Sequence, residues 1–159
     1  MDIRYVAGLF DGEGWVRADP FTPKNRNFPR YQVQAGIGMT HRPIIEALHA
    51  EFGGTFTSYN GYAKRNPNSR TVWTWTTASR IAYRFLKVVE PHLVVKRDQV
   101  LIALQLQEHV ATHKGFVNHM AAEDQVRIFE FRRGLHEEMK RLKKVEYPSV
   151  DSDPMVSAA

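Results

Sequence analysis

At residues 6–14 the chain carries the stretch VAGLFDGEG, whose apolar positions predict a short helix. Val6 and Phe10 recur at the spacing of one helical face, and Asp2 is suited to cap the start of that helix. Glycines near the end of the stretch, Gly14 being the last, favour termination there. The stretch therefore predicts a helix that carries acidic residues where it stops.

Those acidic residues are Asp11 and Glu13. Carboxylates at the C-terminal end of a helix face the negative end of its dipole, which costs about 0.3–1 kcal/mol each. A divalent cation is the simplest compensation, since Mg²⁺ binds carboxylate oxygen and water. By itself, however, an acidic glycine-rich helix end would produce the same four letters at residues 11–14.

The middle of the chain is strongly basic. Residues 14–89 hold eleven Lys or Arg against three acidic residues, whereas the flanking parts are slightly acidic, so the net charge of +5 is concentrated there. Residues 52–89 contain no Asp or Glu. Such a one-sided stretch favours a polyanionic partner such as nucleic acid. A solvated basic face would give the same composition, so charge alone leaves both interpretations open.

The hydropathy pattern predicts a helix, a hairpin, a helix, a hairpin and then further helices. Apolar alternation indicates strands, helical spacing indicates helices, and Thr40 and Ser79 are suited to cap two of the helices. The expected strands cover residues 15–18, 30–39, 55–59 and 70–77, and the expected later helices cover residues 79–89, about 96–110 and about 121–144, the last with Ile128, Phe131, Leu135, Met139 and Leu142 along one side.

Taken whole, residues 6–14 resemble the signature motif of the LAGLIDADG homing endonucleases. Identical letters stand at Ala7, Gly8, Leu9, Asp11 and Gly14, and Glu13 replaces the usual Asp with the same chemistry. A second stretch, residues 91–99, resembles the family's P-x-L-x-x-K-x-x-Q helix start. The resemblance implies an α+β fold with an α-β-β-α-β-β-α core and, in each subunit, a four-stranded antiparallel DNA-binding saddle followed by C-terminal helices.

The resemblance also assigns roles around the motif. It implies that Glu13, with Gly12 beside it, binds Mg²⁺ or Mn²⁺ at the scissile phosphates, and that Lys96 is the catalytic-site lysine. Asp11 would tie the helix end to neighbouring backbone. The family often has a glutamine at the end of the second strand; here the position is occupied either by Gln34 or by Ile37.

A chain with one copy of the motif is expected to work as a homodimer. In the family two such helices pack together, which here would place Ala7, Gly8, Asp11 and Gly12 at the interface. Small residues permit that close approach, although Gly8 could instead pack inside its own domain.

The two hairpins would lie in the DNA major groove. Arg and Gln side chains suit bidentate contacts to guanine and adenine. On the fourth strand either Arg70, Val72 and Thr74 face DNA with Trp73 and Trp75 under the helices, or the reverse; we expect buried tryptophans. The expected DNA-binding residues are Arg17, Asp19, Lys24, Arg26, Arg30, Gln32, Gln34, Lys64, Arg65 and Arg70.

Together these features predict a metal-dependent endonuclease that cuts both DNA strands at a long pseudo-palindromic site and leaves 3′ overhangs. The alternatives are an RNA maturase or a non-cleaving DNA-binding protein on the same fold, or a small α/β domain whose motif is coincidental. We expect one domain over residues 1–147, with a core at about 3–110, C-terminal helices at about 119–145 and a flexible tail at 148–159. The lack of cysteine and of any signal-like or membrane-spanning stretch favours an intracellular protein without disulfides.

Overall fold

A computed structural model describes residues 1–22, 24, 28–60, 68–113 and 120–144. The observed order confirms the expected α+β arrangement with an antiparallel sheet. Its elements are α1 (Ile3–Glu13), β1 (Gly14–Phe21), β2 (Arg30–Met39), α2 (Arg42–Phe52), β3 (Thr55–Tyr59), β4 (Val72–Ala78), α3 (Ser79–Val89), the 3₁₀ turn η2 (Glu90–His92), α4 (Arg97–Thr112) and α5 (Ala122–Leu142). Among the described residues no helix is long and apolar enough to cross a membrane.

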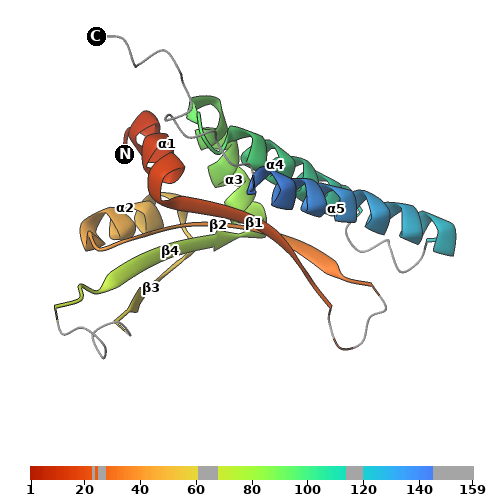
Figure 1. Cartoon of the computed structure of the whole chain (residues 1–159), viewed down its shortest axis with the longest axis horizontal. Coiled ribbons are helices and arrows are strands. Elements are labelled where there is room, and N and C mark those ends of the chain that lie inside the picture. The colour runs from red at the N-terminus through yellow and green to blue at the C-terminus, as the bar shows by residue number, and fades with distance from the viewer. Residues whose placement is uncertain (23, 25–27, 61–67, 114–119, 145–159) are drawn as a thin grey trace, which may run out of the picture.

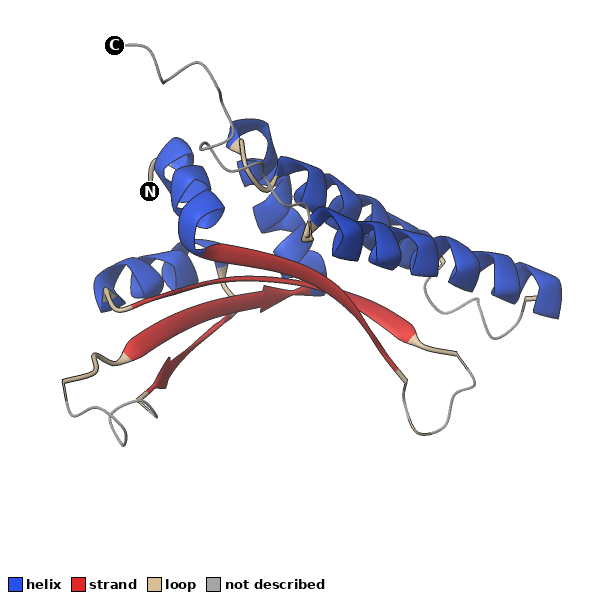
Figure 2. Cartoon of the chain, viewed as in Figure 1, coloured by secondary structure: helices blue, strands red, loops and turns tan. Residues whose placement is uncertain are grey.

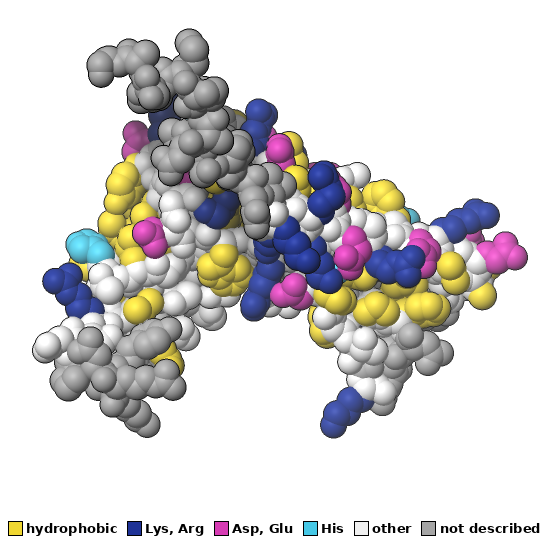
Figure 3. Space-filling view, viewed as in Figure 1, with side chains coloured by type: hydrophobic (Ala, Val, Ile, Leu, Met, Phe, Trp, Pro, Cys, Tyr) yellow, Lys and Arg dark blue, Asp and Glu magenta, His cyan; other side chains and the backbone are white. Residues whose placement is uncertain are grey.

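The four strands form one antiparallel sheet in the order β1-β2-β4-β3, so β1 and β3 are its edges. All the helices of the described residues lie on one side of this curved sheet, and no element among those residues covers the opposite, concave side (Figures 1 and 2). The space-filling view is correspondingly hollowed beneath the sheet (Figure 3). The molecule therefore presents one open sheet face, which the strands of its two hairpins form.

Alternation along the strands explains why only one face is covered. Val16, Ala18, Val33, Ala35 and Ile37 are almost fully buried against the helices, whereas the residues that alternate with them point to the open side. Trp75 lies at the centre of the core and donates a hydrogen bond from Nε1 to the carbonyl of Gly53, 2.7 Å away.

The fourth strand has the orientation we expected. Trp75 is fully buried, and Trp73 is partly buried against the same core with the Arg42 guanidinium 4.6 Å from the centre of its ring. The register places Thr74 and Thr76 opposite Gly38 and Gly36, on the open side.

Helix α1 begins as its sequence indicates. The Asp2 carboxylate accepts from the backbone N–H of Arg4 at 2.7 Å and of Tyr5 at 3.4 Å, which satisfies two of the free donors at the helix start. Val6 and Phe10 are completely buried, so this helix is held against the sheet by its apolar side.

Several local predictions are wrong. The chain turns at Thr40, so His41 is the N-cap of α2, with no side-chain capping bond; Ala78 rather than Ser79 precedes α3 in the same way. Strand β4 begins at Val72, two residues later than expected, which leaves Arg70 exposed before the strand. The expected tail at residues 148–159 lies outside the described part of the chain.

Helix α5 also differs from the expected apolar stripe. Its buried residues include Arg132 and His136 beside Ile128 and Met139, whereas Phe131 is 42% exposed. Polar side chains can occupy these positions because each finds a hydrogen-bond partner in the folded chain.

Candidate nucleic-acid interface and acidic helix end

Asp11 joins the end of α1 to the start of α4. Its carboxylate accepts from the backbone N–H of Val94 at 2.8 Å and of Lys96 at 2.9 Å. Lys96 makes a second bond to the same residue: its ammonium donates to the backbone carbonyl of Asp11. The unfavourable acidic helix end is thus compensated for Asp11 by backbone donors and a cation, as the resemblance implied for this residue.

The Glu13 carboxylate, unlike that of Asp11, is not hydrogen-bonded to the described part of the chain. It is exposed, with Gly12 exposed before it, and it has no hydrogen bond or ion pair to the described part of the chain. Nor do the described residues contain any group of three or more His, Cys, Asp or Glu that could hold a metal ion. One free carboxylate still fits Mg²⁺, which keeps several waters and is commonly bound by one or two carboxylates together with phosphate oxygens.

One side of α1 has no partner within the described chain. Gly8 and Gly12 are exposed, and a Cβ built on either would meet nothing within 4 Å. Tyr5, which lies on the same side, is 51% exposed. Ala7 differs from our expectation, since it is completely buried in the subunit's own core and its side chain is unavailable to a second chain.

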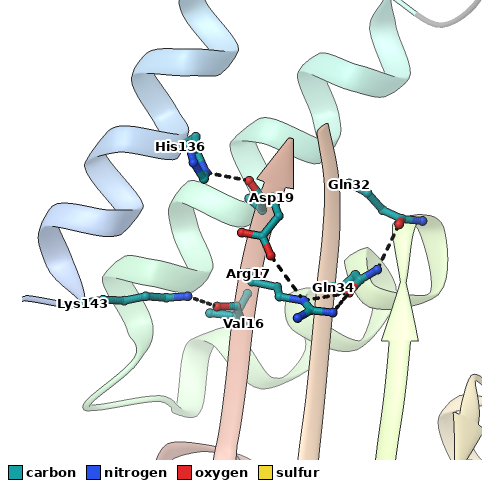
Figure 4. Close-up of polar contacts among 8 residues, drawn as sticks. Val16, Arg17, Asp19, Gln32, Gln34, His136 and Lys143 are labelled. Atoms are coloured by element: carbon teal, nitrogen blue, oxygen red, sulfur yellow. Dashed lines mark hydrogen bonds and ion pairs between the residues drawn. The ribbon is translucent and has the colours of Figure 1, made fainter. Parts of the chain in front are cut away.

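The open face near β1 and β2 carries a connected set of polar side chains (Figure 4). The Arg17 guanidinium donates from Nε and Nη2 to Oε1 of Gln34, at 2.8 and 2.5 Å, and lies 3.6 Å from the Asp19 carboxylate. Gln34 donates in turn to Gln32, whose Nε2 donates to Oγ of Ser79 at 3.2 Å. Arg17, Asp19, Gln32 and Gln34 also line a shallow hollow on the surface, together with Pro20 and Phe21.

Two further features of the open face were not expected. Trp15 lies directly over Gly36, where a Cβ would come within 2.6 Å of the indole ring, and the Arg17 guanidinium is 4.9 Å from the centre of that ring. The alternation of β1 contains the signal, because Trp15 shares the parity of Arg17.

The glutamine often found at the end of the family's second strand has no counterpart at Ile37. Ile37 pairs with Gly14 but is completely buried on the helix side. Gln34 lies on the open face three residues earlier, opposite Arg17. Neither residue therefore brings an amide to the acidic end of α1.

The other expected DNA-binding residues are only partly described. Arg30, Lys24 and Arg70 are exposed at or beside the strand ends. Arg26, Lys64 and Arg65 fall outside the described residues. On β3 and β4 the open side carries Thr55, Thr57, Thr74 and Thr76, as the strand register requires.

The basic excess in the middle of the chain is not confined to this face. Arg42 belongs to α2 and pairs with Glu46, and Arg80, Arg84 and Lys87 are exposed on α3. These helices lie on the other side of the sheet, so their basic residues do not add to the positive charge of the open face. The open face is therefore less basic than the sequence suggested.

Helix α5 contributes contacts that the sequence did not suggest. His136 lies 2.9 Å through Nδ1 from the carbonyl of Ala18, and Lys143, just after the helix, donates from Nζ to the carbonyl of Val16 at 2.6 Å (Figure 4). Desolvation lowers the pKa of Lys143, with the neighbouring Asp19 opposing the shift. A histidine in register with Ile128 and Arg132 was the available signal for burial on this helix.

A second polar contact holds α5 to α4. Arg132 donates from Nε to Nδ1 of His109 at 3.2 Å, and the rings of His109 and His113 are 4.3 Å apart. Burial, followed by the positive charge of Arg132, lowers the pKa of His109 to about 4. His109 is thus a neutral acceptor at neutral pH.

Comparison with known proteins gives similarity in structure only. Neither a protein-family model nor a curated protein matches the chain by sequence. Three similar solved structures are homing endonucleases: I-CvuI with its DNA target (TM-score 0.70, 14% identity, 93% of this chain and 85% of that one), the archaeal intron-encoded I-Vdi141I with DNA (0.67, 17%, 92% and 87%), and the LAGLIDADG enzyme I-SmaMI bound to cleaved DNA (0.64, 12%, 89% and 45%).

These similarities cover 89–93% of this chain. They agree with the resemblance carried by residues 6–14 and 91–99, which are held together by Asp11 and Lys96. The chain has the fold of the LAGLIDADG homing endonucleases.

Proposed function

We propose that this protein is a homodimeric, site-specific DNA endonuclease that uses a divalent metal. The observation that carries the proposal is the exposed Glu13 carboxylate at the end of α1, which has no partner among the described residues, together with an open sheet face lined by Arg17, Gln32 and Gln34. DNA-bound homing endonucleases with the same fold support this assignment.

The open face is suited to bind the major groove. Arginine and glutamine side chains can make paired hydrogen bonds to guanine and adenine, and threonines on β3 and β4 offer hydroxyls to either. Arg30, Lys24 and Arg70, which are exposed near the strand ends, would contact phosphates. Each subunit would read one half of a long pseudo-palindromic site.

For cleavage, Glu13, with Gly12 beside it, would hold Mg²⁺ or Mn²⁺. When bound, such an ion polarises the phosphate and lowers the pKa of a coordinated water. Lys96 would stabilise the negative charge that develops on the phosphate oxygens. Its bond to the Asp11 carbonyl supports this role, because it keeps the ammonium at the same helix end as Glu13.

A dimer would bring two such helix ends together. The unpartnered side of α1, with Gly8 and Gly12, allows close approach of a second α1. The coverage of I-SmaMI supports this, because nearly all of the present chain matches 45% of that longer chain. Two cuts, one from each subunit, would yield a double-strand break with 3′ overhangs.

The decisive experiment is selection of cleaved molecules from a randomised double-stranded DNA library in the presence of Mg²⁺. We expect one family of related sites to be recovered, and a chelator to abolish recovery. Glu13→Gln should lower the cleavage rate of the selected site by at least about 100-fold while its affinity persists, since catalytic charge stabilisation of this kind is worth that much.

Glu123→Gln is the matched control, because it removes another exposed carboxylate at the start of α5. It should cut like the wild type. Tight DNA binding without metal-dependent cleavage would contradict the nuclease assignment and favour a non-cleaving binder, and tight binding to RNA alone would favour a maturase.

A further inference from the structure

Strand β1 is an edge of the sheet and has a strand neighbour on one side only. Its pairing to β2 runs from Gly14 to Phe21, and no strand of the described chain lies on its other side. An edge strand leaves alternate N–H and C=O groups unpaired, so its backbone is held less firmly than that of an inner strand. Yet this strand carries Arg17, the central arginine of the open face.

Side chains from α5 and from the residue just after it supply partners for two carbonyls on this edge. His136 donates from Nδ1 to the Ala18 carbonyl, since a carbonyl can only accept, and the Lys143 ammonium donates to the Val16 carbonyl. Figure 4 shows both side chains reaching β1 from the side opposite β2. The two bonded carbonyls belong to the residues immediately before and after Arg17.

The position of Arg17 follows from the backbone between those two carbonyls. Its side chain points to the open face, where it bonds to Gln34, and Gln34 in turn bonds to Gln32. A shift or twist of β1 at residues 16–18 would therefore displace the whole set of hydrogen bonds that orients the guanidinium.

We infer that His136 and Lys143 are positioning residues for sequence recognition: they fix β1 from α5 so that Arg17 is held in one orientation toward the base edges. This inference rests on the proposed function, because it assigns α5 a part in reading DNA. Neither side chain is required to contact DNA in this role.

The other charges near the end of α5 act within the helix. Lys140 pairs with Glu137, and Arg141 pairs with Glu138, each three residues apart. Lys140 is thus a matched control for Lys143: it is also an exposed lysine near the end of α5, but its bond stays on the helix.

The test compares base preference at every position of the selected target. Arg17→Ala first identifies the base pairs that depend on Arg17, and Thr74→Ala identifies a set that depends on β4, two strands away. Lys143→Met and His136→Phe then each remove one donor, and the second keeps a planar aromatic ring at the position. Thermal unfolding checks that each variant is folded; Lys143 is exposed, so its variant keeps the test valid if His136→Phe unfolds.

We expect Lys143→Met and His136→Phe to weaken discrimination about three- to tenfold at the base pairs identified by Arg17→Ala, the range of one hydrogen bond to a carbonyl. Discrimination at the base pairs identified by Thr74→Ala should remain unchanged. Lys140→Met should discriminate between bases like the wild type at every position.

Two results would overturn the inference. One is an unchanged profile in the folded Lys143→Met variant. The other is an equal loss of affinity for all sites with a shallower salt dependence, which is the result expected if Lys143 contacts a phosphate. A wild-type protein with no base preference at all would instead refute the proposed function, and the positioning role with it.

Discussion

Gly36 has no room for a side chain, so we expect a larger residue at this position to destabilise the fold. A Cβ there would lie 2.6 Å from the Trp15 ring and 2.7 Å from the backbone carbonyl of Trp75. The backbone atom cannot move aside, so Gly36→Ala should lower the free energy of unfolding by about 1–3 kcal/mol, the usual effect of overpacking. Denaturant unfolding at 25 °C measures the change.

Gly38, two residues along the same strand, is the control for this prediction. A Cβ there would come no closer than 3.4 Å, to the Thr74 hydroxyl. Gly38→Ala should therefore unfold with nearly the wild-type free energy. Equal destabilisation of the two variants would show that the loss of stability comes from replacing any glycine of this strand, and not from the contact with Trp15.

His109 makes the stability of the folded chain depend on pH. In the unfolded chain its pKa is near 6.5, whereas burial and Arg132 lower it to about 4 in the fold. Between these values the unfolded state binds a proton that the folded state does not, so the free energy of unfolding should fall as the pH drops from about 6.5 to about 4. Below that range this contribution is fully lost.

The measurement is the difference between the wild type and His109→Gln in denaturant unfolding at several pH values. Glutamine can still accept from Arg132 but does not titrate. The variant should show a shallower loss of stability over this window. Parallel curves for the two proteins would exclude His109 as the source.

At the scale of elements, α1 has an unpartnered side that we assign to a second subunit. Gly8→Leu should stabilise the isolated helix, since glycine within a helix is less favourable by up to about 1 kcal/mol. The same change should block close approach of two α1 helices. Light scattering over a range of concentrations is expected to show a weaker dimer.

Gly134→Leu is the control, because Gly134 is also helical, exposed and free of neighbours within 4 Å of an added Cβ, but lies on α5. It should leave the association state unchanged. If Gly8→Leu associates like the wild type, α1 is not the subunit interface.

Sequence patterns were sufficient to predict the elements whose residues alternate or recur regularly. Strand β2 and the cap at Asp2 follow from local side-chain chemistry, and so their bounds agree with the sequence. The contacts of His136 and Lys143 could not be predicted, because they join residues 118 and 127 positions apart along the chain. Burial of Arg132 likewise depends on a partner in another helix.

The candidate site was predictable to a similar extent. Residues 6–14 indicated the acidic helix end, and their resemblance to the family motif implied that Asp11 ties up neighbouring backbone. The partners themselves, the backbone N–H groups of Val94 and Lys96, could not be predicted, because they lie 83 and 85 positions farther along the chain. Ala7 was assigned to the wrong surface because small residues suit a core and an interface equally well.

At the scale of the whole molecule, the concave open face predicts strong dependence of DNA binding on salt. Binding that neutralises phosphates releases counterions, so affinity falls steeply as salt rises. With about six phosphate contacts in a dimer, affinity should drop about a thousandfold between 50 and 200 mM salt. Fluorescence anisotropy with a labelled duplex measures this; an affinity independent of salt would exclude the open face as the binding surface.

The bonds from α5 to the edge of β1 also protect the molecule from self-association. Unpaired carbonyls along an edge strand can pair with a strand of another chain, which is a common start of aggregation. While His136 and Lys143 occupy the carbonyls of Ala18 and Val16, that edge is blocked. Truncation within α5 would therefore expose unpaired carbonyls on the edge of β1. On heating, such shortened forms of the protein should aggregate at a lower temperature than that at which they unfold.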